Sequence, residues 1–290
     1  KSVTSIAYDA TDGKIYCASK GGLFVVENNT GKVVSKYTNL DGLININLTS
    51  LAIDNKRRLW IGAADGSISI LDLANLGWKY IFDIKNSSES NKTINRLLPA
   101  GNFMFVATGY GIQKISVTSL NFIDAPYYKL GSFPVNTIVY SLVTKGDNLY
   151  AATKAGVAWA NYVSANLNNP ASWSNYNQAP LNAEVRAIET AGNLVLAGSD
   201  GGFSYFDGNI WQPYPNGTVS SLPIKEIDAI GSNVFFIGGS RIYFAPADNL
   251  PAVNTYLDPA NYSTLSHNAN QQPIAGLLDN GIRLEDYTSF

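Results

Sequence analysis

The stretch that decides the fold is LTSLAIDNKRRLWIGAADG, residues 48–66, because related versions of it recur along the chain. It opens with the short apolar segment 48–51. A second apolar run, 59–63, follows about ten residues later, and Asp65 and Gly66 come directly after it. Short runs of β-branched, aromatic and other apolar residues that are bounded by Gly, Asn and Asp are typical of β-strands.

The opening segment has seven copies, whose starts lie 45, 46, 45, 46, 39 and 50 residues apart. They are Val3-Thr4-Ser5-Ile6, Leu48-Thr49-Ser50-Leu51, Ile94-Asn95-Arg96-Leu97, Val139-Tyr140-Ser141-Leu142, Val185-Arg186-Ala187-Ile188, Ile224-Lys225-Glu226-Ile227 and Ile274-Ala275-Gly276-Leu277. A period of about 45 residues built from short strands is typical of the blades of a β-propeller.

The first six copies are each followed by a second apolar run that ends in small residues, then by a glycine-bearing turn and a third run. A more variable outer run, such as 32–37, completes a four-stranded blade. The sequence therefore predicts an all-β chain with a single β-propeller domain over 1–290. Its blades begin near residues 3, 48, 94, 139, 185, 224 and 274.

The last repeat is irregular, because only 17 residues remain from Ile274 onward and 281–284 resembles a third strand with the second one missing. Three interpretations stay open: a reduced seventh blade, a shortened chain, or a closed six-bladed ring with a tail. We favour six full blades plus an incomplete seventh.

Composition excludes several classes of function. The hydrophobic fraction of 46% supports a substantial core. The sequence contains no run of 18 or more apolar residues, which is the length that a membrane-spanning helix needs. A net charge of −2 with 14% charged residues leaves no basic stripe for nucleic acid. Cys17 is the only cysteine and His267 the only histidine, so neither a disulfide nor a Cys/His zinc cluster can form within the chain. We predict no cofactor and assign no metal ligands; calcium bound by oxygen atoms of the loops stays open, although no motif supports it.

Two repeats carry a resemblance to a known family. The second repeat has Asp41-Gly42-Leu43, Leu59-Trp60-Ile61-Gly62 and Asp65-Gly66, and the fifth has Gly201-Gly202-Phe203, Phe206-Asp207-Gly208, Trp211 and Tyr214. These segments resemble the two-component regulator propeller repeat of Bacteroidetes-type bacteria. The resemblance implies kinship with periplasmic sensor regions of hybrid histidine kinases and with surface propeller proteins of type IX secretion. It also implies an exported protein, periplasmic or at the cell surface.

Catalysis finds little support. His267 lies in a segment rich in Asn and Pro, away from any nucleophile motif. Paired carboxylates of the glycosidase kind remain an alternative, although the aspartates mostly stand in turn-like contexts. We therefore interpret these aspartates as structural residues of turns: Asp9, Asp12, Asp41, Asp54, Asp65 and Asp200. We predict that the protein is not an enzyme.

A ligand face follows from the register of the repeats. The turns between second and third strands place six residues at equivalent points of six blades, where they could grip a polar or anionic ligand. These predicted ligand-binding residues are Lys20, Asp65, Tyr110, Lys154, Asp200 and Arg241. Aromatic pairs near outer strands form a second candidate set for stacking on sugars or proteins: Trp78 and Tyr80, Trp173 and Tyr176, and Trp211 and Tyr214.

The sequence thus predicts a non-catalytic binding or sensing propeller outside the cytoplasm, with a glycan or an envelope protein as ligand. A structural segment of a larger surface or secretion-system protein and a carbohydrate-active enzyme using paired carboxylates are the alternatives.

Overall fold

A computed structural model describes residues 2–257, 259–279 and 281–284. The described chain is almost entirely β-strand and turn, with short helical turns at Asn39–Asp41 (η1), Asp83–Asn86 (α1) and Pro170–Ser172 (η2). It divides into two compact units. Unit 1 takes the described residues of Lys1–Gly109, Gln113–Asp124 and Ser263–Phe290, and unit 2 takes Tyr110–Ile112 and those of Ala125–Tyr262.

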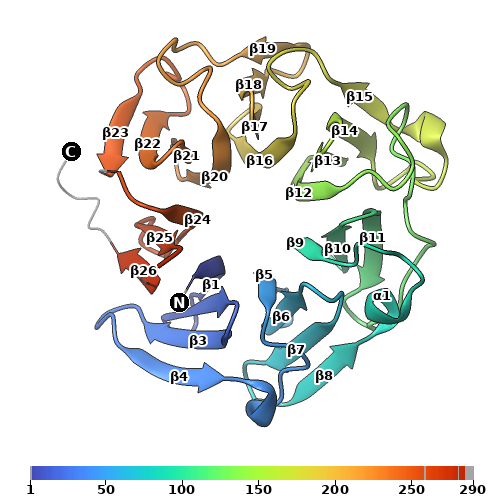
Figure 1. The fold of residues 1–290 in the computed structure, drawn as a ribbon, viewed down its shortest axis with the longest axis vertical. Coiled ribbons are helices and arrows are strands. Elements are labelled where there is room, and N and C mark those ends of the chain that lie inside the picture. The colour runs from blue at the N-terminus through green and yellow to red at the C-terminus, as the bar shows by residue number, and fades with distance from the viewer. Residues whose placement is uncertain (1, 258, 280, 285–290) are drawn as a thin grey trace. The chain divides into compact units, whose positions relative to one another are not determined.

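Unit 1 holds all or most of four antiparallel sheets, called blades here (Figure 1). Two have four strands: β1 (Val3–Asp9), β2 (Lys14–Ser19), β3 (Gly22–Glu27) and β4 (Val33–Tyr37), then β5 (Leu48–Ile53), β6 (Arg58–Ala63), β7 (Ile68–Asp72) and β8 (Trp78–Ile81). Two have three strands: β9 (Ile94–Ala100), β10 (Phe103–Thr108) and β11 (Gly111–Ser116), then β24 (Tyr262–His267), β25 (Pro273–Leu277) and β26 (Gly281–Leu284).

Unit 2 holds three four-stranded blades with the same consecutive strand order (Figure 1). They are β12 (Val139–Lys145), β13 (Asn148–Thr153), β14 (Gly156–Asn161) and β15 (Ser174–Tyr176); β16 (Val185–Ala191), β17 (Leu194–Ser199), β18 (Gly202–Phe206) and β19 (Trp211–Pro213); and β20 (Ile224–Ile230), β21 (Asn233–Gly238), β22 (Arg241–Pro246) and β23 (Asn254–Leu257).

The predicted start of the last blade is wrong. The first strands of six blades begin at Val3, Leu48, Ile94, Val139, Val185 and Ile224, where the repeat places them. The segment at Ile274, however, lies in β25, the second strand of its sheet. The first strand is β24, which begins at Tyr262, so the described residues form a seventh blade of three strands, and the tail on a six-bladed ring is excluded. The prediction of six full blades is also wrong in one place, because the blade that begins at Ile94 has three strands in its sheet.

The same irregularity marks the first strand of these six blades. In each, one extra residue follows the first residue of the strand, so that the pairing with the second strand shifts at that point. Such a bulge turns its extra residue out of the regular alternation of the sheet. The extra residues are Thr4, Thr49, Asn95, Tyr140, Arg186 and Lys225.

Buried serines beside this bulge join neighbouring blades of unit 1. The Ser5 hydroxyl accepts a hydrogen bond from the backbone N–H of Leu51 in the next blade, at 3.0 Å. Ser50, at the equivalent place, accepts one from the N–H of Leu97 at 2.9 Å. Because buried polar groups cost stability unless they are paired, this repeated contact accounts for the serine that the first two opening segments share.

Small residues in the second strand allow neighbouring blades to pack closely. Gly62 in β6 lies against the Ile94 side chain of β9, and a methyl group on Gly62 would overlap that side chain. Between the first two blades, Leu59 and Ile61 join a core that also contains Tyr16 and Leu23. Side chains of adjacent blades therefore form one continuous apolar layer.

Cys17 is expected to be chemically inert in the native protein. It lies in β2 and its side chain is buried, in a cluster with Ile6, Ile15 and Val26. Burial raises the pKa of the thiol, and only the thiolate reacts readily with disulfide reagents. Native protein should therefore leave 5,5′-dithiobis(2-nitrobenzoate) unreacted until denaturant is added. Rapid labelling without denaturant would contradict this placement.

Candidate functional site

The predicted ligand-binding residues of unit 1 take different roles. Lys20 is exposed in the turn between β2 and β3. Asp65, in the turn between β6 and β7, accepts hydrogen bonds from the N–H and hydroxyl of Ser67 and pairs with Lys85 at 2.9 Å. Burial alone would raise the pKa of Asp65, but the hydrogen bonds from Ser67 and Lys85 hold it well below its usual range. Asp65 therefore already has partners within the protein.

The other four predicted residues lie in unit 2. Tyr110 precedes β11 and is buried, with its ring 5.9 Å from that of Tyr128. Arg241 is exposed at the start of β22. Lys154 and Asp200 are exposed in the β13–β14 and β17–β18 turns. Of the six, the structure places Lys154 and Asp200 in one connected set of contacts.

That set, called the Arg186 cluster here, consists of Tyr140, Lys154, Glu184, Arg186 and Asp200. Glu184 is its centre: it accepts a hydrogen bond from the Tyr140 hydroxyl at 2.7 Å and pairs with Arg186 at 2.5 Å. Arg186 also donates two hydrogen bonds to the Asp200 carboxylate, from Nη2 at 2.9 Å and from Nε at 3.2 Å. Such two-point contacts fix the orientation of both groups.

The bulges explain how these side chains meet. Tyr140 and Arg186 are the extra residues of β12 and β16, in adjacent blades of unit 2. The Arg186 guanidinium lies 4.6 Å from the centre of the Tyr140 ring, a cation–π geometry. Burial, together with the hydrogen bond to Glu184, raises the pKa of Tyr140 to about 12, so the phenol remains a hydrogen-bond donor at neutral pH.

The cluster offers recognition chemistry. Its two cations and two carboxylates balance in charge, and Lys154 contacts Glu184 only at 3.9 Å with 59% of its side chain exposed. Asp200 is 49% exposed. A ligand could replace the water around Lys154 and Asp200. Rearranging these ion pairs would cost the protein little stability, because exposed ion pairs contribute little to it. Glu184 and Asp200 both pair with the Arg186 guanidinium.

Sequence reasoning missed Tyr140, Glu184 and Arg186. A signal was nevertheless present, since the second residue of the opening segment is polar or aromatic in the first six copies: Thr4, Thr49, Asn95, Tyr140, Arg186 and Lys225. A polar residue inside an otherwise apolar strand indicates a bulge or an inward-facing site.

The aromatic pairs are mostly core residues. Trp173 is buried and donates its indole N–H to the Leu167 carbonyl at 2.9 Å. Trp211 is buried with its ring stacked 5.7 Å from Tyr176. Tyr214 stacks on Phe203 at 4.2 Å. Tyr80, at 43% exposed, is the exception, and its ring lies parallel to that of Trp78.

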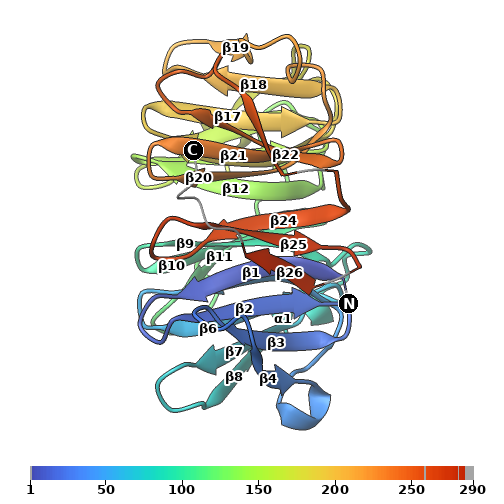
Figure 2. The same ribbon diagram turned by 90° about the vertical axis from the view of Figure 1, so that its left-hand side faces the viewer.

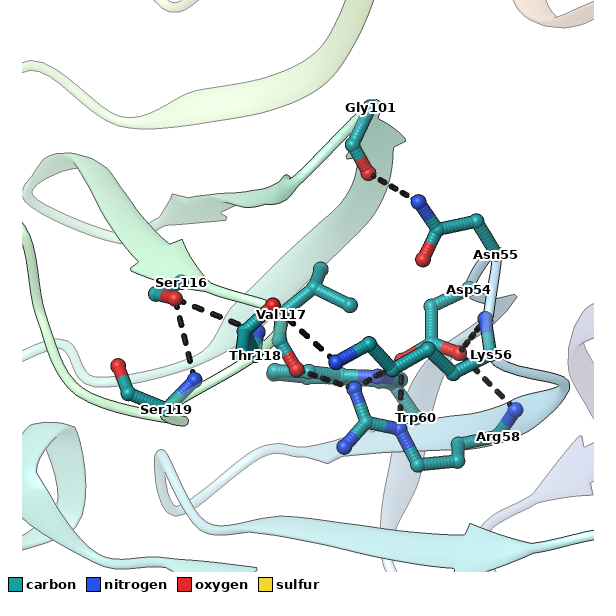
Figure 3. Close-up of polar contacts among 10 residues, drawn as sticks. All are labelled: Asp54, Asn55, Lys56, Arg58, Trp60, Gly101, Ser116, Val117, Thr118 and Ser119. Atoms are coloured by element: carbon teal, nitrogen blue, oxygen red, sulfur yellow. Dashed lines mark hydrogen bonds and ion pairs between the residues drawn. The ribbon is translucent and has the colours of Figure 1, made fainter.

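A second polar cluster, in unit 1, surrounds Asp54 (Figure 3). Asp54 accepts hydrogen bonds from Arg58 at 2.6 and 2.8 Å and from the Trp60 indole at 2.8 Å, while Arg58 also donates to the Val117 carbonyl. The Asp54 side chain is fully buried and that of Arg58 is 8% exposed. Because the charges of Asp54 and Arg58 are paired with each other in the protein interior, these two residues serve the structure.

Each unit has a surface hollow of its own. One of about 430 Å³ in unit 1 borders the Asp54 cluster and is lined by residues that include Lys56, Lys79 and Asp72. A larger one of about 930 Å³ in unit 2 is lined by the β16–β17 and β20–β21 turns, with Asn193, Ser232 and Asp248. These turns stand at the opposite ends of the strands from Asp200, so the larger hollow is separate from the Arg186 cluster.

Within residues 2–257, 259–279 and 281–284, no three His, Cys, Asp or Glu side chains gather closely enough to hold a metal ion. In the same part of the chain no helix has the length and apolar character needed to cross a membrane.

The comparisons with known proteins agree on the fold. The family described as the N-terminal β-propeller domain of PorZ in the type IX secretion system matches residues 15–174. None of the curated proteins compared with the chain matches it.

Among solved structures, one is PorZ of Porphyromonas gingivalis, described as an essential surface component of the type IX secretion system. It has 18% identity and a TM-score of 0.77, and the match covers 98% of this chain and 36% of PorZ. Another is the extracellular domain of a putative hybrid two-component system, BT3049 of B. thetaiotaomicron, with 16% identity, a TM-score of 0.76, and coverage of 98% and 39%.

The Cps50 (Swd1) β-propeller domain of Myceliophteria thermophila gives 13% identity, a TM-score of 0.76, and coverage of 99% and 98%. At these identities the likeness shows the β-propeller fold. The chain spans well under half the length of the two bacterial structures.

Proposed function

Because the chain belongs to the family of N-terminal β-propeller domains of PorZ in the type IX secretion system, we propose that it is a non-catalytic binding domain of an exported envelope protein. The proposal is supported by the description of the family, which names the type IX secretion system, and by the structural relatives, which are described as a surface component and an extracellular domain. A glycan or another envelope protein is the ligand that fits this setting.

The observation that carries the proposal is the Arg186 cluster. Its central groups are oriented by Arg186 before any ligand arrives, while Lys154 and Asp200 remain largely exposed. Preorganised polar groups lower the cost of binding. Donors from Lys154 and Arg186 beside acceptors from Asp200 suit a ligand with both kinds of group, such as a hydroxyl-rich or carboxylated glycan or a polar protein segment. Arg241 lies outside this cluster, at the start of β22, and is a further exposed cation among the predicted ligand-binding residues.

A structural role in a larger protein is the second candidate. This role is supported by the lengths of the two bacterial relatives, since the match covers 36% and 39% of their chains and the rest of each lies outside it. In that case the Arg186 cluster would serve only the packing of adjacent blades, and its exposed cations would be dispensable.

The double variant Lys154→Ala/Arg241→Ala distinguishes the two. Exposed turn residues usually change stability by less than about 0.5 kcal/mol, so melting should be unaltered. Binding to envelope glycans or envelope proteins of the producing cells should weaken, and the loss should shrink as salt is raised, because salt screens exposed charges. Calorimetric titration at low and high salt measures both effects.

The variant Lys32→Ala/Lys129→Ala is the matched control, since it removes two exposed cations that lie outside the cluster and are not among the predicted ligand-binding residues. We expect it to bind like the wild type. Equal affinity of all three proteins would refute the ligand face, and a complete lack of binding by the wild type would favour the structural role.

A further inference from the structure

One guanidinium nitrogen of the Asp54 cluster in unit 1 is left over. The Arg58 side chain is 8% exposed, and it donates from Nε and Nη2 to Asp54 and from Nη2 to the Val117 carbonyl. Its third nitrogen, Nη1, has no hydrogen-bond partner among the residues that the structure describes, and no dashed line reaches it in Figure 3. An arginine carries five N–H donors, two of them on Nη1. Two donors of a nearly buried cation are therefore available to a ligand.

Arg58 lines the hollow of about 430 Å³ in unit 1, called the Arg58 hollow here. The strands β6, β7 and β8 follow one another across this blade (Figures 1 and 2). Asp72 of β7 stands opposite Arg58, and Lys79 of β8 stands opposite Ile70. Residues that stand opposite each other, or two apart in one strand, share a face of the sheet. The four side chains therefore line the hollow from one face of a single sheet.

Two lysines of this hollow have no carboxylate partner. Lys56 lies in the β5–β6 turn, where the Asp54 carboxylate accepts its backbone N–H at 2.9 Å. Its ammonium group donates to the Thr118 hydroxyl, just after β11, at 3.1 Å. Lys79 is exposed, and in the described part of the chain neither lysine pairs with Asp or Glu. The turn and Thr118 thus position Lys56 beside the hollow before any ligand arrives.

The Asp72 carboxylate also lines the hollow but is engaged in its own turn. It accepts the backbone N–H groups of Ala74 and Asn75, at 2.9 and 3.3 Å, and the Asn75 side-chain amide at 3.2 Å. Because Arg58 and Asp54 compensate each other, two lysines against one aspartate leave one positive charge around the hollow. That balance favours an anion over a cation.

We propose that the Arg58 hollow binds a phosphate or sulfate group, held by Arg58 Nη1 and by the ammonium groups of Lys56 and Lys79. These donors come from three separate elements, β6, the β5–β6 turn and β8. A tetrahedral oxyanion offers an oxygen to each of them, and hydrogen bonds between charged groups are stronger than neutral ones. A carboxylate, with two oxygens in one plane, would satisfy fewer of these donors.

The volume of the hollow leaves room for more than the anion alone. Pockets for small organic ligands measure about 300 to 1,000 Å³, and this one has about 430 Å³. Asn75 and Thr118 line it beside the cations and carry groups that bond to hydroxyls. The oxyanion can therefore be a free ion or a monoester of a small polar molecule. Either way, the site lies in unit 1 and shares no residue with the Arg186 cluster.

Side-chain NMR of arginine tests the proposal, because Arg58 Nη1 is the least accessible of the three donors. Protein labelled with [15N]arginine would be titrated with sulfate, inorganic phosphate, glucose 6-phosphate and, as a control, acetate, all at constant ionic strength. We expect a saturable shift of the Arg58 signals with the phosphate and sulfate ligands and none with acetate. Tighter binding of glucose 6-phosphate than of inorganic phosphate would identify a monoester as the ligand, and equal or weaker binding would identify the free ion.

Variants at the rim of the hollow change its charge in both directions. Lys56→Ala/Lys79→Ala should weaken phosphate binding about tenfold or more, because two charged donors are lost. Its melting temperature should not change, since both side chains are exposed. Asp72→Asn should strengthen binding, because it removes the negative charge at the hollow and keeps an oxygen for the turn.

Two further variants complete the test. Asp54→Leu/Arg58→Met removes the guanidinium together with its partner and should abolish phosphate binding. Lys32→Ala/Lys129→Ala, which removes exposed cations elsewhere, should bind phosphate like the wild type. If Asp54→Leu/Arg58→Met fails to fold, the lysine variant and the Arg58 signals of the wild type still decide the question.

Three results would overturn the inference: no saturable shift of Arg58 with any phosphate or sulfate ligand, an equal shift with acetate, or a phosphate affinity that Lys56→Ala/Lys79→Ala leaves unaltered. The proposed function can fail separately, because Lys154→Ala/Arg241→Ala should not change the response of Arg58 to phosphate. If the protein binds no envelope glycan or protein while Arg58 still responds, only the proposed function fails.

Discussion

Replacing Asp54 by alanine is expected to lower the free energy of unfolding by about 3 to 5 kcal/mol, because the change leaves Arg58 charged and buried without its partner. Asp54 accepts hydrogen bonds from the Arg58 side chain, from the Trp60 indole and from the backbone N–H groups of Lys56 and Arg58. Denaturant unfolding followed by tryptophan fluorescence measures the loss.

Asp72→Ala is the matched control, since Asp72 also caps a hairpin turn but lies near the surface. It should cost about 1 kcal/mol, the usual effect of losing such a cap. The double variant Asp54→Leu/Arg58→Met should recover much of the stability, because it removes both charges and keeps the volume filled. A loss for Asp54→Ala no larger than that for Asp72→Ala would show that the ion pair is not buried.

Ile61→Asp is expected to cost more than about 4 kcal/mol, enough to prevent folding at ordinary temperatures. Ile61 is 1% exposed and packs between the first two blades, and Trp60, its neighbour in β6, is also fully buried. A carboxylate at this position would be buried without any partner. Secretion yield and melting temperature report the effect.

The conservative variant Ile61→Val serves as its control, with an expected loss of about 0.5 to 1.5 kcal/mol from one missing methylene. If Ile61→Asp melted near the wild type, the layer between these blades would not be the continuous core described above.

Much of the fold was predictable because six first strands repeat the same apolar pattern. Val3, Leu48, Ile94, Val139, Val185 and Ile224 each open a strand. The seventh was misplaced because β24, with the sequence Tyr-Ser-Thr-Leu-Ser-His, is mostly polar. Thr264 in this strand is nevertheless buried, and its methyl group packs over Gly276. The more apolar β25 at Ile274 resembled a first strand.

The candidate site was predictable only in part. Turn register identified Lys154 and Asp200. Glu184 lies ahead of β16, and nothing in its spacing indicates that it meets Tyr140, which lies 44 residues earlier. Tyr110 shows the opposite error: its turn position matches that of Lys154, yet its side chain is buried. Register predicts where a residue lies, but packing decides where its side chain points.

The most direct test of the central claim, that this domain binds at the Arg186 cluster without chemistry, is a titration followed by backbone NMR. The labelled domain would be titrated with envelope glycans or proteins from the producing cells. We predict that the signals of Lys154, Arg186 and Asp200 shift while those of Asn193, Ser232 and Asp248 in the larger hollow do not, and that the ligand is recovered unchanged. Shifts confined to the hollow, or conversion of the ligand to a product, would contradict the account.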